Sequence, residues 1–168
     1  MLQTFIRDLQ QPEYVHVLLN PLPVYGLAIG SIGLVVALCL RSRRAHMTAL
    51  VLIFVADGSA WPVVHYGEEA YDCVLSMADR DGEAWLKAHE QRADKFEYLF
   101  YALALLAAAA IFLPKKWPAT AMPLAVATLI VALVSLGAGG YVAYAGGKIR
   151  HREFRTGPPP HTKTQENP

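Results

Sequence analysis

Long apolar stretches alternate with short, strongly charged ones along this chain. A membrane-spanning helix needs about 20 mostly apolar residues, because each residue rises about 1.5 Å and the hydrocarbon layer is roughly 30 Å thick. Four stretches meet this requirement, over about residues 22–40, 47–66, 96–113 and 119–144. Backbone polar groups in lipid must pair within the protein, and the stretches lack the alternation of barrel strands, so each is predicted to be a helix. The pattern predicts an all-α, four-helix transmembrane bundle over residues 21–150.

The polar segment 67–95 separates the second predicted span from the third. It is rich in acids and helix formers, and a turn signal interrupts it only at Asp81-Gly82. We expect two short interfacial helices there, joined by a turn. Residues 1–20 are expected to form an N-terminal interfacial segment, and the proline-rich, polar residues 151–168 a disordered tail.

Composition agrees with a membrane protein and argues against several other classes. Hydrophobic residues make up 54% of the chain, and the net charge of +1 hides a sharp segregation of charged residues. A nucleic-acid-binding protein would carry a basic surface, so that class is not favoured. The two cysteines, Cys39 and Cys73, have neither zinc-ribbon nor covalent-haem spacing. No nucleophile triad or phosphate loop is found, so no catalytic residue is assigned and an enzyme is not favoured.

The turns between the spans indicate an orientation. Four spans place both termini and the segment 67–95 on one side and two tight turns on the other. The tight turns carry five basic residues and no acid: Arg41, Arg43, Arg44, Lys115 and Lys116. Dense positive charge favours the cytoplasm, so we expect a bacterial-type inner membrane with the termini and polar loop in the periplasm. The total of lysines and arginines is larger on the loop side, which leaves the opposite orientation open.

Four of the histidines fall on one side of the predicted bundle. They are His16, His65, His89 and His151, whereas His46 falls on the opposite side. Two of these four could be the axial ligands of a b-type haem. Histidine is also common at membrane interfaces, so a purely structural explanation stays open.

A second pattern combines imidazoles with carboxylates. If the second helix continues beyond the membrane, His65, Glu68 and Glu69 lie on one of its faces, and His89-Glu90 begins another acidic stripe. Imidazole and carboxylate groups on facing helices bind zinc, manganese or non-haem iron. A divalent-metal site made by these residues is therefore an alternative to haem, and a merely solvated acidic face explains the same pattern.

Asp57 is the only formal charge deep within a predicted span. An ionisable group in a bilayer is costly, so we expect Asp57 to be buried against other spans and largely neutral at pH 7. It could form a hydrogen bond with Ser31 or Ser135, or transfer protons. Pro62, close after Asp57, is expected to kink the helix.

Short motifs recur at the span ends. They are His16 with Pro21 and Pro23, the segment His65 to Glu69, His89-Glu90, and Gly139 with Gly140 to Tyr144. In these motifs, over roughly residues 14–151, the chain resembles a domain-of-unknown-function family of small four-span bacterial membrane proteins. The resemblance implies the fold and membrane location, and the cytochrome-type modules joined to some relatives imply a redox setting. The chain departs from the family at Asn20-Pro21, so the resemblance does not assign His16 a ligand role.

Three functions from different classes follow from these patterns. The chain could be a b-type haem electron carrier with a cytochrome-type redox partner, a His/carboxylate metal-binding membrane protein, or a non-catalytic subunit without a cofactor that assembles with other membrane subunits. If a cofactor is bound, His65 and His89 are the predicted ligand pair, with Glu68 and Glu90 as ligands or as acceptors for the imidazole protons. His16 and His151 rank second, since Lys148, Arg150 and Arg152 near His151 would repel a cation.

Overall fold

The computed structural model describes residues 2–160. The helices are α1 (Leu2–Asp8), α2 (Pro12–Leu19), α3 (Leu27–Leu40), α4 (Arg43–Gly58), α5 (Ala60–Ser76), α6 (Arg80–Phe112) and α7 (Ala121–Arg150). Shorter elements are a π-helical turn at Leu22–Gly26 and 3-10 turns at Leu113–Lys115, Pro118–Thr120 and Arg152–Phe154. No strand occurs within the described range, so the predicted all-α class is confirmed.

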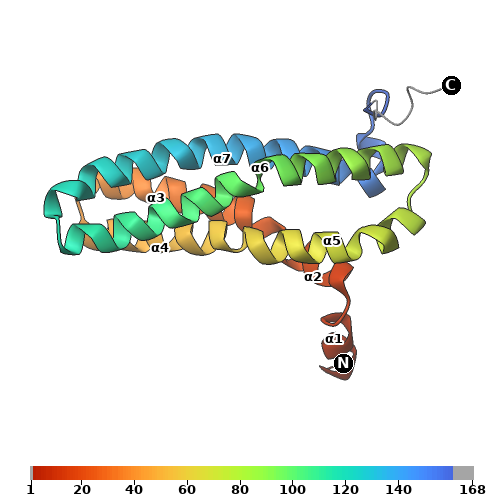
Figure 1. The fold of residues 1–168 in the computed structure, drawn as a ribbon, viewed down its shortest axis with the longest axis horizontal. Helices are drawn as coiled ribbons and strands as arrows, with labels where there is room; N and C mark the ends of the chain where they lie inside the picture. Colours follow the sequence, from red (N-terminus) through yellow and green to blue (C-terminus); the bar gives the residue numbers. More distant parts are fainter. Residues whose placement is uncertain (1, 161–168) are drawn as a thin grey trace.

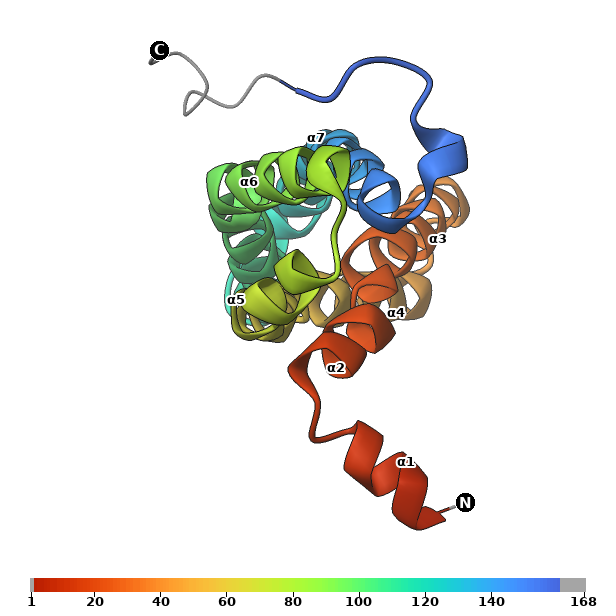
Figure 2. The ribbon, with the colours of Figure 1, turned by 90° about the vertical axis from the view of Figure 1, so that its right-hand side faces the viewer.

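Four helical segments are long and apolar enough to cross a membrane. They are Pro12–Leu40, Arg43–Ser76, Arg80–Lys115 and Pro118–Arg150. The segments run up and down in one elongated bundle, with two tight turns at one end (Figure 1). α2, the end of α7 and the α5–α6 turn lie toward the other end, as predicted from the odd–even geometry of four spans. α1 projects away from the bundle (Figure 2).

The segment 67–95 does not form the two separate interfacial helices that we expected. α5 continues to Ser76 and α6 begins at Arg80, so the polar residues lengthen the two long helices. The 33 residues of α6 span about 50 Å, which exceeds a hydrocarbon layer of about 30 Å. The turn lies at residues 77–79, since the Asp79 side chain caps α6 by accepting from the Gly82 N–H. The Asp81-Gly82 turn signal therefore belongs to the first turn of a helix.

Prolines interrupt the first two segments without ending them. The chain passes from α2 to α3 through the π-helical turn Leu22–Gly26, next to Pro21 and containing Pro23. Proline has no N–H to donate, so the regular hydrogen-bond pattern cannot continue past it. In the second segment, Pro62 leaves the Gly58 carbonyl without its helical donor, and the helix is interrupted at Ser59. This interruption lies where the sequence predicts a kink.

Small residues bring the helices of the apolar half close together. A Cβ atom added at Gly30 of α3 would lie 2.8 Å from Ile53 Cγ1 of α4, so the two backbones are in near contact. Ile53 and Leu103 are fully buried in the core at this level. Outside the bundle, Ile32 and Leu105 are 66% and 72% exposed. A small-residue interior with large apolar side chains outside is typical of helices packed in lipid.

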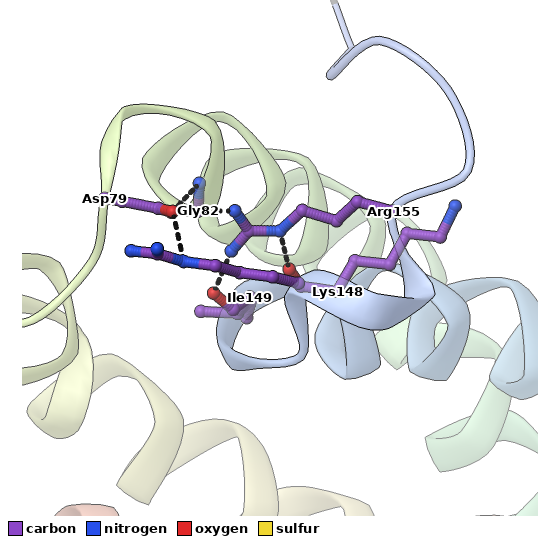
Figure 3. A network of polar contacts seen from close by, with 6 residues as sticks. Asp79, Gly82, Lys148, Ile149 and Arg155 are labelled. Carbon is purple, nitrogen blue, oxygen red and sulfur yellow. Dashed lines mark hydrogen bonds and ion pairs between the residues drawn. The ribbon is translucent and has the colours of Figure 1, made fainter.

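A network of polar contacts closes the end of the bundle at the α5–α6 turn (Figure 3). The Arg155 Nη1 atom donates to both carboxylate oxygens of Asp79, at 2.8 and 2.9 Å. Its Nε and Nη2 atoms donate to the carbonyls of Lys148 and Ile149 at the end of α7. The Gly82 N–H and the Arg155 guanidinium together hold the pKa of Asp79 below its ordinary value of 3.8. This network, the Asp79–Arg155 clasp, joins the start of α6 to the end of α7.

Arg155 belongs to the segment predicted to be a disordered tail. Its side chain is only 8% exposed, and a 3-10 turn at Arg152–Phe154 precedes it. Residues 151–155 therefore pack on the bundle, because the guanidinium finds a carboxylate and free helix-end carbonyls there. The last part of the predicted tail, residues 161–168, lies outside the described residues.

Candidate functional site

A cavity of about 280 Å³ lies inside the bundle near the α5–α6 end. Seen along the bundle, α2 and α5 form one pair of helices and α6 and α7 another (Figure 2). Residues of all four helices line the cavity between the pairs. Its walls are largely apolar and include Val24, Val63 and Phe100, and two histidines, His16 and His89, face it. A largely apolar cavity with a few polar groups is typical of a small-molecule or cofactor site.

His16 is held against α5 by a backbone hydrogen bond. Its Nδ1 atom lies 2.8 Å from the carbonyl oxygen of Val63. Gly67, one helical turn further along α5, leaves room for the ring, since a Cβ atom there would lie 2.9 Å from His16 Nδ1. A residue with a side chain at position 67 would therefore displace the imidazole.

His89 is held against α7 in the same way. Its Nδ1 atom lies 3.0 Å from the carbonyl oxygen of Val142, and a Cβ atom at Gly146 would lie 3.1 Å from His89 Nδ1 and Cε1. In both cases a histidine binds a carbonyl on the neighbouring helix, and the residue four positions later on that helix is glycine. The two arrangements are equivalent on opposite sides of the cavity.

The two imidazoles lie next to each other. Their ring centres are 6.3 Å apart and their planes are inclined by 86°. A backbone carbonyl can only accept, so the proton of each neutral ring is on Nδ1 and the lone pair is on Nε2. Neither Nε2 atom has a hydrogen-bond partner among the described residues. Each ring is thus fixed by a backbone contact and keeps an Nε2 lone pair that can bind a metal.

The acidic residues around the cavity come from α5 and α6, and the basic residue comes from α7. Glu68 on α5 and Glu90, Asp94 and Glu97 on α6 line it on one side. Arg150, at the end of α7, is the basic residue of the lining. An anionic group on a bound molecule would therefore be attracted toward Arg150 and repelled from the α5–α6 side.

The other predicted site residues lie elsewhere. His65 is exposed, stacks on Trp61 with ring centres 5.7 Å apart, and lies 3.6 Å from Glu69. His151 is also exposed and pairs with Glu153 at 2.9 Å. Neither lines the cavity, so the structure pairs His89 with His16 in place of His65, the partner we favoured.

The predicted set of metal ligands is not gathered into one cluster. His65 and Glu69 are near each other, but the His89 ring lies inside the bundle beside His16. Across residues 2–160, no group of three or more His, Cys, Asp or Glu side chains is arranged to hold a metal ion. Of the five predicted residues, Glu68, His89 and Glu90 line the cavity, whereas His65 and Glu69 lie outside its lining. Residues 65 and 67 lie about 200° apart around a helix, and Gly67 faces the interior, so His65 points away from it.

Asp57 is fully buried, as predicted. Neither of its carboxylate oxygens has a hydrogen-bond partner in the described chain, and the same holds for the hydroxyls of Ser31 and Ser135. The hydrogen bond with Ser31 or Ser135, one of the two alternatives for Asp57, is therefore not formed. A protonated Asp57 remains our prediction, because a neutral carboxyl avoids an unpaired charge in the apolar interior.

The histidine partners of two glycines of the site were not predicted from the sequence. Gly67 is part of the motif after the second span, and Gly146 is one of several glycines in the fourth. In each case the glycine comes four positions after the residue whose carbonyl accepts from the histidine. This spacing could not be recognised beforehand, because the sequence does not show which helices are in contact.

Comparisons with protein-family models, with curated proteins and with solved structures find no match for this chain. The resemblance to a four-span bacterial family therefore stays a prediction. The function has to be argued from the geometry of the cavity itself.

Proposed function

We propose that this protein is a b-type haem electron carrier of a bacterial-type inner membrane, with His16 and His89 as axial ligands. The observation that carries the proposal is the pair of imidazoles across the cavity, at 6.3 Å between ring centres. Imidazoles on opposite sides of one metal ion have ring centres about 6.4 Å apart, since each metal–nitrogen bond is about 2.0 Å and the nitrogen lies roughly 1.2 Å from its ring centre. The observed spacing agrees with this value.

The backbone contacts of the two rings support the same role. Histidines that bind metals usually donate their other ring N–H to a carbonyl or carboxylate, which fixes the tautomer and the ring orientation. The contacts of His16 with Val63 and of His89 with Val142 have this form. The rings are therefore oriented before any ligand binds, which lowers the entropy cost of binding.

The donor set favours haem over a bare metal ion. A protein zinc site almost always has four ligands in a tetrahedron. The cavity offers two imidazoles, which would suit a haem iron, since a haem needs only two ligands from the protein. The apolar side chains of Val24, Val63 and Phe100 fit contact with the faces of a macrocycle, and Arg150 fits a propionate group. The carboxylates of Glu68 and Glu90 would direct propionates away from the α5–α6 side.

The residues have separate tasks in this proposal. His16 and His89 would hold the iron of the haem, and the chemistry that the haem would supply here is the uptake and release of one electron. Gly67 and Gly146 give the imidazoles room. The apolar side chains of the lining would limit the access of water to the haem.

The location in the cell is part of the same proposal. The tight turns carry Arg41, Arg43 and Lys115 without acids nearby in sequence, which supports cytoplasmic turns and a periplasmic cavity end. Single cysteines introduced at Ser42 and Ala84 in a Cys-free background should label from opposite sides of the membrane. If Ser42 labels only from the periplasm, the proposed orientation is reversed.

A visible absorption spectrum of the detergent-purified protein tests the haem assignment. We expect a Soret band with sharp α and β bands after reduction, and one iron per chain by elemental analysis. His16→Ala and His89→Ala should each abolish the low-spin spectrum while the helical circular dichroism is kept. His65→Ala is the matched control, because His65 lies outside the cavity, and it should keep full haem. A colourless wild type grown with haem supplied, or equal loss in the His65 variant, would refute the assignment.

A further inference from the structure

A second cavity, of about 780 Å³, lies at the opposite end of the bundle. It is bordered by the start of α4, the end of α6, the start of α7 and the two tight turns. His89 and Ala110, which lines this cavity, lie about 31 Å apart along α6 at 1.5 Å per residue. The second cavity is therefore a separate site from the histidine pair.

The charge of this cavity has one sign. Arg41, Arg43 and Lys115 line it together with His46, and no acid is among the lining residues. Cations that share a cavity repel one another, and a bound anion would offset that repulsion. The lining is therefore complementary to an anionic group.

Arg41 has a backbone conformation that needs explaining. Its φ of 50° is the only positive value among the non-glycine residues described, and it ends α3 in the left-handed region. Glycine is the usual residue at such a helix end, because a side chain there costs roughly 1 kcal/mol. Arginine at this position is consistent with a use for its side chain, which borders the cavity.

His46 adds a polar group that lacks a partner. Its Nε2 atom is buried and makes no hydrogen bond within the described part of the chain. Buried polar atoms are nearly always paired, by protein, water or ligand. This atom is not accessible to solvent, so His46 contributes its ring to the border of the cavity, and the positive charge of the lining comes from Arg41, Arg43 and Lys115.

We propose that this cavity binds the phosphate headgroup of an anionic phospholipid. The site lies where the apolar spans end at the tight turns, the level at which headgroups lie. Met47, Ile111 and Met122 give the cavity an apolar wall for the upper part of an acyl chain. Basic pockets between transmembrane helices are a known form of headgroup recognition. The combination of cations and apolar wall favours a lipid over free phosphate.

Native mass spectrometry of the detergent-purified protein tests the proposal, with phosphatidylglycerol and phosphatidylcholine titrated separately. We expect one molecule of phosphatidylglycerol to bind more tightly than phosphatidylcholine. Removal of one cation should weaken binding about fivefold, and removal of two about thirtyfold, because each contributes about 1 kcal/mol near a membrane surface.

Two variants make the test independent of folding. Arg41→Gly removes the charge and the left-handed strain together, so it should fold at least as well as the wild type yet bind phosphatidylglycerol about fivefold more weakly. Lys115→Gln should show the same loss, whereas Lys116→Gln, in the same turn but outside the lining, should bind as the wild type does. The proposal is overturned if the two lysine variants lose affinity equally or if both lipids bind alike. Displacement by inorganic phosphate, or tighter binding of a soluble quinone, would also overturn the lipid assignment.

Discussion

Gly146→Ala adds one methyl group to α7 opposite the ring of His89. The new Cβ atom would lie 3.1 Å from Nδ1 and Cε1 of the imidazole, a few tenths of an ångström closer than ordinary contact. The ring must move, and the hydrogen bond from Nδ1 to the Val142 carbonyl, now 3.0 Å, is lengthened or lost. Such a bond contributes about 1 kcal/mol. This loss opposes a gain of about 1 kcal/mol from replacing glycine by alanine within a helix.

Gly147→Ala is the matched control, because a Cβ atom at Gly147 meets nothing within 4 Å. The control should therefore show only the gain in stability from replacing glycine by alanine within a helix. The Gly146 variant should be less stable than the control by about 1–2 kcal/mol. For a chain of this size the gap corresponds to roughly 2–8 °C in melting temperature, measured by circular dichroism in detergent. Equal melting temperatures for the two variants would refute the contact between Gly146 and His89.

Two further predictions concern packing and pH. Gly30→Ala would place a Cβ atom 2.8 Å from Ile53 Cγ1 and should destabilise the protein by roughly 1–3 kcal/mol in thermal unfolding, whereas Gly33→Ala, whose Cβ would meet only a methyl at 3.6 Å, should not. The Asp79–Arg155 clasp contributes stability above the ordinary carboxyl pKa of 3.8 and should be lost as the pH falls through the lowered pKa of folded Asp79. Fluorescence of Trp85, in a background with the other tryptophans replaced by phenylalanine, should report an acid transition that Asp79→Asn abolishes; an unchanged transition in that variant contradicts the assignment.

The spans could be predicted because a spanning helix is recognised from the average hydropathy of about 20 consecutive residues. Each apolar stretch had to be a helix, and four of them had to place the α5–α6 turn and both termini at one end. The polar segment was harder to predict. Asp81-Gly82 has the composition of a turn, but Asp79 accepts from the Gly82 N–H and makes these residues the first turn of α6. The turn therefore lies a few residues before the position that we expected. The two helices expected in the polar segment are continuations of α5 and α6.

The histidine pair shows a different limit of sequence analysis. The topology places His16, His65 and His89 at one end of the bundle, but it does not give the rotation of each helix about its axis. The rotation of α5 turns Gly67 toward His16 and leaves His65 exposed beside Trp61. That rotation depends on the packing of α5 on α2, and no local spacing records it.

The position of His89 along α6 has an electrical consequence. His89 lies about two helical turns, or roughly 10 Å, before the apolar stretch that begins near residue 96. A membrane voltage falls mainly across the hydrocarbon layer, where moving one charge through 100 mV takes about 2.3 kcal/mol. If His89 holds a haem as we propose, an electron exchanged there with a partner on the same side would cross almost none of that layer. Its transfer would therefore proceed with the same driving force in an energised membrane as in a depolarised one.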